Sequence, residues 1–335
     1  MTPGLNGSMR TSAVLISLFT TASPLGTLVS MAMDRLPRAR MSLGTFFERS
    51  ESSVSDDKAR IWSWGETTEF NNRQSDDVVL MFHDPWLNRT TNGKGYIKNQ
   101  PWHGADGMEN LRTVKEPKQS IPTFTETVQL LMKPENLHVK FNVDVKVQND
   151  PVRLFSLMHQ IISAQPDWET KLAPRILLGM WHPIFLPHAK ELLPYCARSY
   201  IGFNLWNARR YFWDSVDTFS MSFGSMTTAA GEEFRKEVQA VGKKLMVWTV
   251  NEPVCMVEAV RWKVDVILTD VPQTWIDLRE ALTVDYDKTS AQYGRTFLWS
   301  TWRYYPPFQI FIRTLEYQWL HYAKGPFILP DAAAA

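Results

Sequence analysis

A histidine and an aspartate that follow an apolar run near residue 80 are the side chains best placed to do chemistry. Residues 78–82 are all apolar, His83 and Asp84 come next, and the loop behind them holds Arg89 and Thr90. Histidine can donate or accept a proton near neutrality, and α/β barrels present catalytic groups at the carboxyl ends of their strands. We therefore predict that His83 transfers protons, with a purely structural histidine as the alternative.

Three polar residues share one face of a second apolar strand. Asn142, Asp144 and Lys146 alternate with apolar residues, and strand side chains alternate between two faces. Because an unpaired buried charge is costly, this face is not a plain apolar core. A carboxylate can ligate a hard divalent cation and an amine can bind a phosphate oxygen. The alternative is a buried Asp144–Lys146 ion pair that closes the barrel floor.

Other strand ends carry weaker candidates. Trp248 and Asn251 end an apolar run, so Trp248 could line a pocket and Asn251 could donate a hydrogen bond at its rim. A core tryptophan followed by a turn-forming asparagine explains the same residues equally well. His182 also follows a strand, and we treat it as a candidate for lining the pocket. Thr269 and Asp270 give the last strand the same polar ending.

The elements that must position these side chains alternate between strands and helices. This alternation predicts βαβ units and a parallel sheet. The expected strands cover residues 78–82, 138–146, 175–181, 199–203, 220–223, 244–250 and 264–269, and the expected helices include 123–132, 151–164 and 232–241. A closed barrel needs eight strands, so one more must come from residues 13–19 or 60–64. We predict an α/β fold, a TIM-type (β/α)8 barrel that is incomplete at its N-terminal strands.

Composition limits the function classes. The chain has 36 basic and 35 acidic residues, without the basic excess typical of nucleic-acid binding, so we expect no nucleic-acid partner. Its two cysteines, Cys196 and Cys255, lack metal-site spacing and cannot form a disulfide framework. No run of about 20 uninterrupted apolar residues predicts a transmembrane helix.

We divide the chain into three parts. Residues 1–74 are predicted to be an irregular leader and linker, and the Ser-, Thr- and Arg-rich stretch 9–40 is typical of a mitochondrial presequence or a weak signal peptide. Residues 75–282 are expected to form the barrel. Residues 283–335 are an aromatic-rich tail, in which Pro306-Pro307 should break any helix. Aromatic and basic residues together favour a membrane interface, with packing on the barrel exterior as the alternative.

Taken in chain order, these segments resemble the glycerophosphodiester phosphodiesterase family, and most closely its fungal branch similar to the phosphatidylglycerol-specific phospholipase C. The matching pieces lie within about residues 75–280 and are His83-Asp84 with Arg89-Thr90-Thr91, the segment 121–126, Asp144-Val145-Lys146, Trp248-Thr249-Val250-Asn251 and Thr269-Asp270-Val271-Pro272. The resemblance implies a metal-dependent phosphodiesterase with two histidines as acid and base, and a divalent cation, Mg2+ or Ca2+, on three carboxylates.

The resemblance also assigns roles to residues. It implies that His83 is the second catalytic histidine, that Lys146 is a catalytic, phosphate-facing amine, and that Asp144 is a metal ligand. The implied substrate-binding residues are Asp84, Arg89, Thr90, Trp248 and Asn251, with His182 as a weak candidate. The implied substrate is a glycerophosphodiester or a glycerophospholipid, cleaved in lipid metabolism at a membrane surface reached through the C-terminal tail. We expect an intracellular, peripheral membrane protein of mitochondria, endoplasmic reticulum or lipid droplets.

The chain departs from the family pattern upstream of His83. The family's first strand carries His-Arg-Gly and a later one carries Glu-x-Asp, but neither motif is present; Glu69, in Glu69-Phe70-Asn71, is the nearest match and a weak candidate metal ligand. A hard cation prefers about six oxygen ligands. Either the N-terminal sequence is a faulty or alternatively spliced gene prediction, or the chain is a non-catalytic barrel that binds lipid or a partner. A sphingomyelinase D-like lyase, which shares the barrel, is a third hypothesis for the function.

Overall fold

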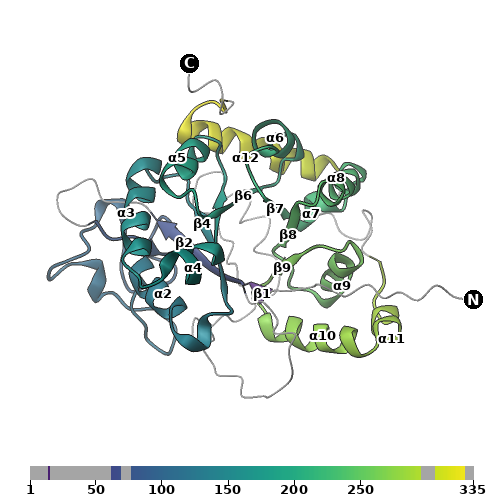
Figure 1. Cartoon of the computed structure of the whole chain (residues 1–335), viewed down its shortest axis with the longest axis horizontal. Coiled ribbons are helices and arrows are strands. Elements are labelled where there is room, and N and C mark those ends of the chain that lie inside the picture. Colours follow the sequence, from purple (N-terminus) through teal and green to yellow (C-terminus); the bar gives the residue numbers. More distant parts are fainter. Residues whose placement is uncertain (1–13, 16–61, 69–76, 296–305, 329–335) are drawn as a thin grey trace, which may run out of the picture.

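The computed structural model describes residues 14–15, 62–68, 77–295 and 306–328, and its centre is a curled, mostly parallel sheet (Figure 1). The strands are paired in the order β1-β9-β8-β7-β6-β5-β4-β2-β3. Their bounds are β1 Val14–Leu15, β2 Trp62–Thr68, β3 Leu80–Met81, β4 Lys140–Val145, β5 Ile176–Met180, β6 Ala197–Gly202, β7 Thr218–Ser222, β8 Lys244–Trp248 and β9 Val266–Leu268. Every neighbouring pair is parallel except β2 with β3. The predicted α/β fold with an incomplete barrel is confirmed.

Two strands bring residues of the predicted leader and linker into the sheet. β1 pairs with β9 and β2 pairs with β4, and both ladders are parallel. β1 and β2 lie close to each other, but no ladder between the described residues joins them. Both strands overlap the ranges 13–19 and 60–64, so the strand count from sequence indicated where the N-terminal strands lie.

The short strand before His83 is not one of the parallel barrel strands. β3 pairs antiparallel with the end of β2, where Thr68 lies opposite Leu80. The prediction that residues 78–82 form a barrel strand was therefore wrong. An apolar run does not reveal strand direction. Val79 is buried because it packs at the start of the first long helix, where its carbonyl accepts a hydrogen bond from Phe124 N–H at 2.7 Å.

Helices surround the curled sheet (Figure 1). The longer ones are α2 Phe124–Leu131, α3 Pro151–Ser163, α5 Phe185–Leu192, α8 Ala229–Ala240, α9 Pro253–Arg261, α10 Pro272–Val284, α11 Tyr286–Ala291 and α12 Pro306–Lys324. The shorter ones are α4 Trp168–Lys171, α6 Leu205–Asn207, α7 Phe223–Met226, η2 Ile97–Asn99, η3 Met108–Asn110, η4 Pro134–Asn136, η5 Ala173–Arg175 and η6 Ala208–Phe212. The helices predicted at 123–132, 151–164 and 232–241 are confirmed to within three residues at each end.

Local side-chain chemistry sets where the first helices begin. The Thr123 hydroxyl accepts a hydrogen bond from Glu126 N–H, and the Glu126 carboxylate accepts one from Thr123 N–H, which is a capping box at the start of α2. Asp150 caps α3 by accepting from Arg153 N–H. Pro151 takes the first helical position, where its missing N–H costs nothing.

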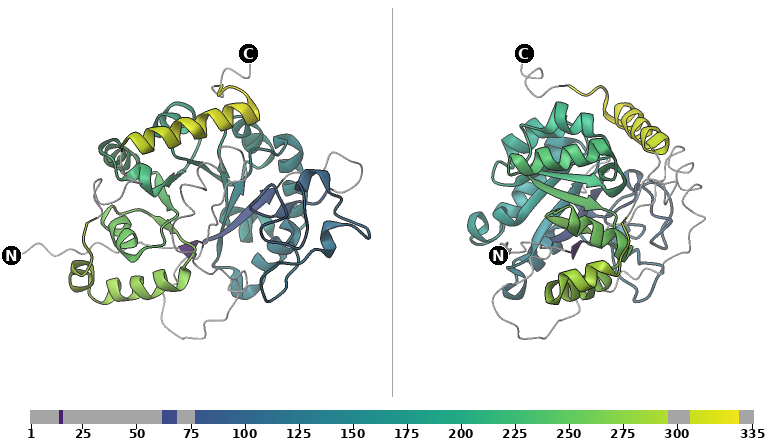
Figure 2. Two further views of the ribbon diagram at one scale, coloured as in Figure 1. Left: turned by 180° about the vertical axis from the view of Figure 1, so that it is seen from behind. Right: turned by 90° about the vertical axis from the view of Figure 1, so that its right-hand side faces the viewer.

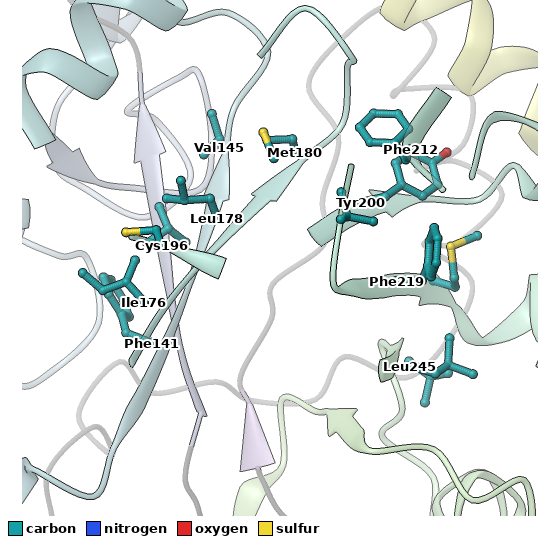
Figure 3. Packing of buried hydrophobic residues seen from close by; sticks show 14 of the residues in the cluster. Phe141, Val145, Ile176, Leu178, Met180, Cys196, Tyr200, Phe212, Phe219 and Leu245 are labelled. Atoms are coloured by element: carbon teal, nitrogen blue, oxygen red, sulfur yellow. The ribbon is translucent and has the colours of Figure 1, made fainter. Parts of the chain in front are cut away.

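The two faces of the sheet differ in polarity. Along β4, Phe141 and Val145 belong to the large apolar cluster that the helices cover, and Figure 3 shows both within this packing. Asn142 and Asp144 alternate with them and are also buried, so they lie on the inner face of the barrel. The sequence therefore places its polar residues inside a barrel whose outer layer is apolar.

The C-terminal residues form a helix that docks on the barrel (Figure 2). α12 begins at Pro306 and Pro307, because proline fits the first helical turn, and no helix of the described residues runs through this pair. Glu316 on α12 accepts a hydrogen bond from Phe203 N–H at 2.9 Å, just after β6. A Cβ atom on Gly202 would come within 2.8 Å of the same carboxyl, so the helix lies close against this strand end.

The Glu316 carboxyl is protonated in part at neutral pH. Burial raises its pKa to about 8, against the smaller opposing effects of the Phe203 hydrogen bond and the Arg313 charge. A raised carboxyl pKa stabilises the docked helix at low pH, and this stabilisation is lost as the pH rises through about 8. None of the described helices, α12 included, is long and apolar enough to cross a bilayer.

We predict that Thr123→Ala lowers the free energy of unfolding by about 1 kcal/mol, because it removes the side-chain cap of α2. Urea denaturation measures this change. Thr125→Ala, in the exposed first turn of the same helix, is the matched control and should change stability by less than about 0.5 kcal/mol. Equal effects of the two substitutions would contradict the capping box.

Candidate active site

His83 is held by a buried carboxylate that is itself clamped by an arginine. His83 Nδ1 lies 2.7 Å from Asp84 Oδ1, and Arg89 donates to both Asp84 oxygens through Nε and, at 2.8 Å, through its terminal amine. Burial acts to raise the pKa of Asp84, but the hydrogen bonds from His83 and Arg89 and their charges outweigh it and lower the pKa. The ionised Asp84 accepts from Nδ1–H, which fixes the orientation of the His83 ring.

The loop that follows His83 is fixed by its own small apolar core. Leu87 N–H donates to Gly95 O at 3.0 Å, and the Thr91 hydroxyl donates to Leu87 O at 2.7 Å. Thr90, predicted to bind substrate, is half-buried, and its carbonyl accepts from Val114 N–H. These contacts hold Arg89 rigidly enough to orient the His83–Asp84 pair.

Asp144 is the centre of a second group of polar side chains, at the carboxyl end of β4. Its side chain is 2% exposed, and its two oxygens accept hydrogen bonds from Trp181 Nε1 at 2.7 Å and from Lys146 Nζ at 2.8 Å. The ion pair that the sequence left open as an alternative is therefore present. Lys146 is 17% exposed, so the amine reaches the barrel mouth while its partner stays buried.

Three aromatic rings cover the inside of the barrel beside Asp144. The ring of Trp248, at the end of β8, lies 4.9 Å from Phe203 and 5.8 Å from Trp181 between centroids. Trp248 was predicted from the sequence, whereas Trp181 and Phe203 were not. Each of these two is an aromatic residue at the carboxyl end of an expected strand, which is the signal that could have identified it.

Asn251 and His182 make internal contacts at the strand ends. Asn251 donates to Asp270 Oδ2 at 2.9 Å and accepts from the Thr269 hydroxyl at 3.0 Å, so it joins the loops after β8 and β9. His182 is buried, with Nε2 at 3.2 Å from Gly325 O and Nδ1 accepting from Ile184 N–H.

The buried His182 is neutral at physiological pH. Burial lowers its pKa to about 4, opposed by the Gly325 hydrogen bond and assisted by the charges of Lys324 and His321. A neutral imidazole that donates to Gly325 O and accepts from a backbone N–H has both ring nitrogens engaged. This explains why it fastens the C-terminal segment to the end of β5.

Glu69, the weak candidate metal ligand, lies outside the described residues. Within β2, the backbone of Glu66 is paired in register with that of Asp144 of β4.

β2 connects the two polar groups. Thr67 of β2 lies opposite Met81 of β3 on one side and opposite Val145 of β4 on the other. Neighbouring strands are about 4.8 Å apart, so the chain leading to His83 and the strand that carries Asp144 are separated by roughly 10 Å. The segment that leads to His83 and the strand that carries Asp144 therefore flank β2.

The described residues do not form a metal centre of the expected kind. Among them no three His, Cys, Asp or Glu side chains come together in a way that could hold a metal ion. Both Asp144 oxygens already accept hydrogen bonds, from Lys146 and from Trp181. A hard cation prefers about six oxygen ligands, so these residues do not fit the cation that the resemblance implies.

A curled parallel sheet with charged groups at the carboxyl ends of its strands is the arrangement in which TIM-barrel enzymes build their active sites. Residues 73–274 match the model of the glycerophosphoryl diester phosphodiesterase family. The chain therefore belongs to the glycerophosphoryl diester phosphodiesterase family, and this confirms the resemblance found in the sequence. No curated protein matches the chain.

Solved structures of the same fold agree with this assignment. A phosphodiesterase from Oleispira antarctica in complex with the product sn-glycerol-3-phosphate is 18% identical, with a TM-score of 0.52 over 64% of this chain and 83% of that one. A glycerophosphodiester phosphodiesterase from Parabacteroides distasonis is 18% identical, with a TM-score of 0.53 over 66% and 84%. A protein described as a glycerophosphoryl diester phosphodiesterase from Agrobacterium tumefaciens is 14% identical, with a TM-score of 0.56 over 82% and 100%. At these identities the likeness shows the fold alone.

We predict that Asp84→Asn lowers the free energy of unfolding by about 2 kcal/mol at pH 7, because it replaces charge-assisted hydrogen bonds with neutral ones. The pKa of Asp84 is lowered in the folded protein, so its stabilisation exists above the ordinary carboxyl pKa and is lost as the pH falls through the folded value.

Urea denaturation at pH 7 and at successively lower pH measures the difference between wild type and variant. The difference should shrink in acid, because protonated Asp84 no longer attracts Arg89. Asp214→Asn, at an exposed site, is the control. A difference that stays constant with pH would contradict the clamp.

Proposed function

We propose that the chain hydrolyses the phosphodiester of a glycerophosphodiester or glycerophospholipid, and that its substrate is a phosphatidylglycerol-type lipid, cleaved as by a phospholipase C. The observation that carries this proposal is the Lys146 ammonium, held 2.8 Å from buried Asp144 at the carboxyl end of β4. A phosphodiester has one negative charge, which a partly exposed ammonium can bind through a charge-assisted hydrogen bond. Family membership supports phosphodiesterase activity in general.

His83 would transfer the proton. Asp84 holds the ring through Nδ1, and we assign to His83 Nε2 the uptake of a proton from a water molecule as the water oxygen attacks phosphorus. A new P–O bond forms, the P–O bond to the leaving alcohol breaks, and the alkoxide takes a proton from solvent. The products are one phosphomonoester and one alcohol, while Lys146 offsets the charge that develops on the phosphoryl oxygens.

A divalent cation, Mg2+ or Ca2+, stays a prediction from the family resemblance. The described residues do not provide a fitting donor set for this cation. A cation that bound Asp144 would have to displace the Lys146 contact. Activity measured with and without chelator tests the requirement.

A non-catalytic barrel is the rival function. Both Asp144 oxygens are engaged by Trp181 and Lys146, so Asp144 is stabilised as a structural ion pair. In this case the Lys146 amine and the aromatic rings would bind lipid without cleaving it. Turnover by the wild-type chain separates the two functions, because only the enzyme releases a phosphomonoester.

We further propose that the chain meets its substrate at an intracellular membrane surface through α12. The inner face of this helix is docked on the barrel, but Ile310 and Phe311 near its start are 62% and 52% exposed. Adjacent exposed apolar side chains on a helix favour insertion at the edge of a bilayer. The helix would lie on the membrane rather than cross it.

We predict that His83→Ala lowers kcat by about 100-fold or more, since it removes the group that moves the proton. Lys146→Met should lower kcat/KM by about 100-fold, because it removes the charge that faces the phosphate. Release of alcohol from glycerophosphoglycerol measures both. His103→Ala is the matched control, because His103 is an exposed histidine of the same loop region. Full activity in either active-site variant would contradict the proposed roles.

We predict that a double Ile310→Ser, Phe311→Ser variant binds phosphatidylglycerol vesicles at least tenfold more weakly, because it removes the exposed apolar pair of α12. Vesicle co-sedimentation measures the binding. The variant should cleave water-soluble glycerophosphoglycerol at the wild-type rate. Unchanged vesicle binding would contradict a membrane role for this face.

A further inference from the structure

Phe327 packs among aromatic rings near the carboxyl end of β5. It lies beyond α12, is 8% exposed, and its ring centroid is 4.4 Å from His182, 5.2 Å from Tyr211 and 5.5 Å from Tyr317. These partners lie in the loop after β5, in η6 and in α12. Three separate segments of the chain therefore hold the ring.

This ring continues the apolar layer inside the barrel. Phe327 and Leu320 of α12 belong to the same buried cluster as Trp181 and Trp248. Trp181 donates from Nε1 to Asp144 at 2.7 Å. An apolar surface therefore runs from the C-terminal segment to the carboxylate that holds Lys146, and Phe327 is its outermost fully seated ring.

The backbone that carries Phe327 is anchored at a single turn. Gly325 ends α12 with φ +81°, its N–H donates to His321 O at 2.8 Å, and its carbonyl lies 3.2 Å from His182 Nε2. A glycine in this conformation is the usual way to end a helix. Ile328, the next residue after Phe327, is 53% exposed, so the segment reaches the surface immediately beyond the ring.

We propose that Phe327 holds the place of the substrate's acyl chain and is displaced by it, so that Phe327 selects acylated glycerophosphodiesters over water-soluble ones. This inference rests on the proposed phosphodiesterase function. When the Phe327 ring moves out, an acyl chain can cover the apolar surface that the ring had covered. Each methylene of the chain that is buried there is removed from water, which is favourable. A glycerophosphodiester without an acyl chain leaves the rings that surround Phe327 exposed to water once the Phe327 ring moves, so it is disfavoured.

Two monomeric substrates that differ only in one acyl chain test the proposal. Glycerophosphoglycerol and lysophosphatidylglycerol, the latter below its critical micelle concentration, are compared at pH 7 by kcat/KM. The wild type should prefer the acylated substrate at least tenfold. Phe327→Ala should raise kcat/KM for glycerophosphoglycerol about tenfold and reduce the preference, because no ring has to leave the barrel end.

Phe327→Leu, which keeps an apolar side chain of smaller size, should give an intermediate preference and decides the question if Phe327→Ala does not fold. Tyr322→Ala is the matched control, because it removes an aromatic side chain of α12 that is 92% exposed. It should leave the preference for the acylated substrate unchanged. Equal loss of activity on both substrates in the Phe327 variants would overturn the proposal and show a structural role.

A wild type that cleaves both substrates equally well would also overturn the proposal, while leaving the phosphodiesterase function intact. A wild type that cleaves neither substrate would overturn the phosphodiesterase function itself, and the inference with it. The two failures are therefore distinguishable in one experiment.

Discussion

A carboxylate buried inside a parallel barrel must be paired, and Asp144 imposes that constraint on the rest of the site. Its partners are the Trp181 indole and the Lys146 ammonium, at 2.7 and 2.8 Å. Removing one partner of a buried charge typically costs about 3–5 kcal/mol, so neither contact is dispensable. Pairing fixes the ammonium at the barrel mouth and turns the tryptophan ring across the barrel interior, where the other aromatic rings and α12 then pack.

β2 gives the site its second half. It lies between β4, which carries Asp144, and β3, which leads to His83. The imidazole and the ammonium are thus placed by neighbouring ladders of one sheet rather than by separate loops. The Asp84–Arg89 clamp then orients the imidazole, so each polar group that could act on a phosphodiester is held by a second buried interaction.

Local patterns were enough to predict most of the fold. The positions of β4 to β9 were predicted from β-branched runs, and the start of α2 can be predicted from the Thr123-x-x-Glu126 pattern. Both signals depend on neighbouring residues alone. The antiparallel direction of β3 depends on its pairing with β2, which no apolar run encodes. The docking of α12 depends on the Glu316–Phe203 contact, whose members are 113 residues apart in sequence.

The candidate site was predicted in part for the same reason. His83, Asp84 and Arg89 are close in sequence, and their contacts followed from the order of residues in one loop. Trp181 was missed, because its hydrogen bond to Asp144 joins residues that are 37 positions apart in sequence. For Asp144 and Lys146 the sequence left two alternatives, a functional site and a structural ion pair. The structure contains the ion pair and places the amine at the barrel mouth.

Phosphorus-31 NMR of the wild-type chain with glycerophosphoglycerol in oxygen-18 water tests the central claim most directly. Hydrolysis at the barrel mouth predicts a new phosphomonoester resonance, shifted by one oxygen-18 atom bound to phosphorus. A cyclic phosphate without oxygen-18 would identify a lyase and contradict the attack by water. A spectrum that shows only the intact diester would contradict the enzyme and favour the lipid-binding barrel.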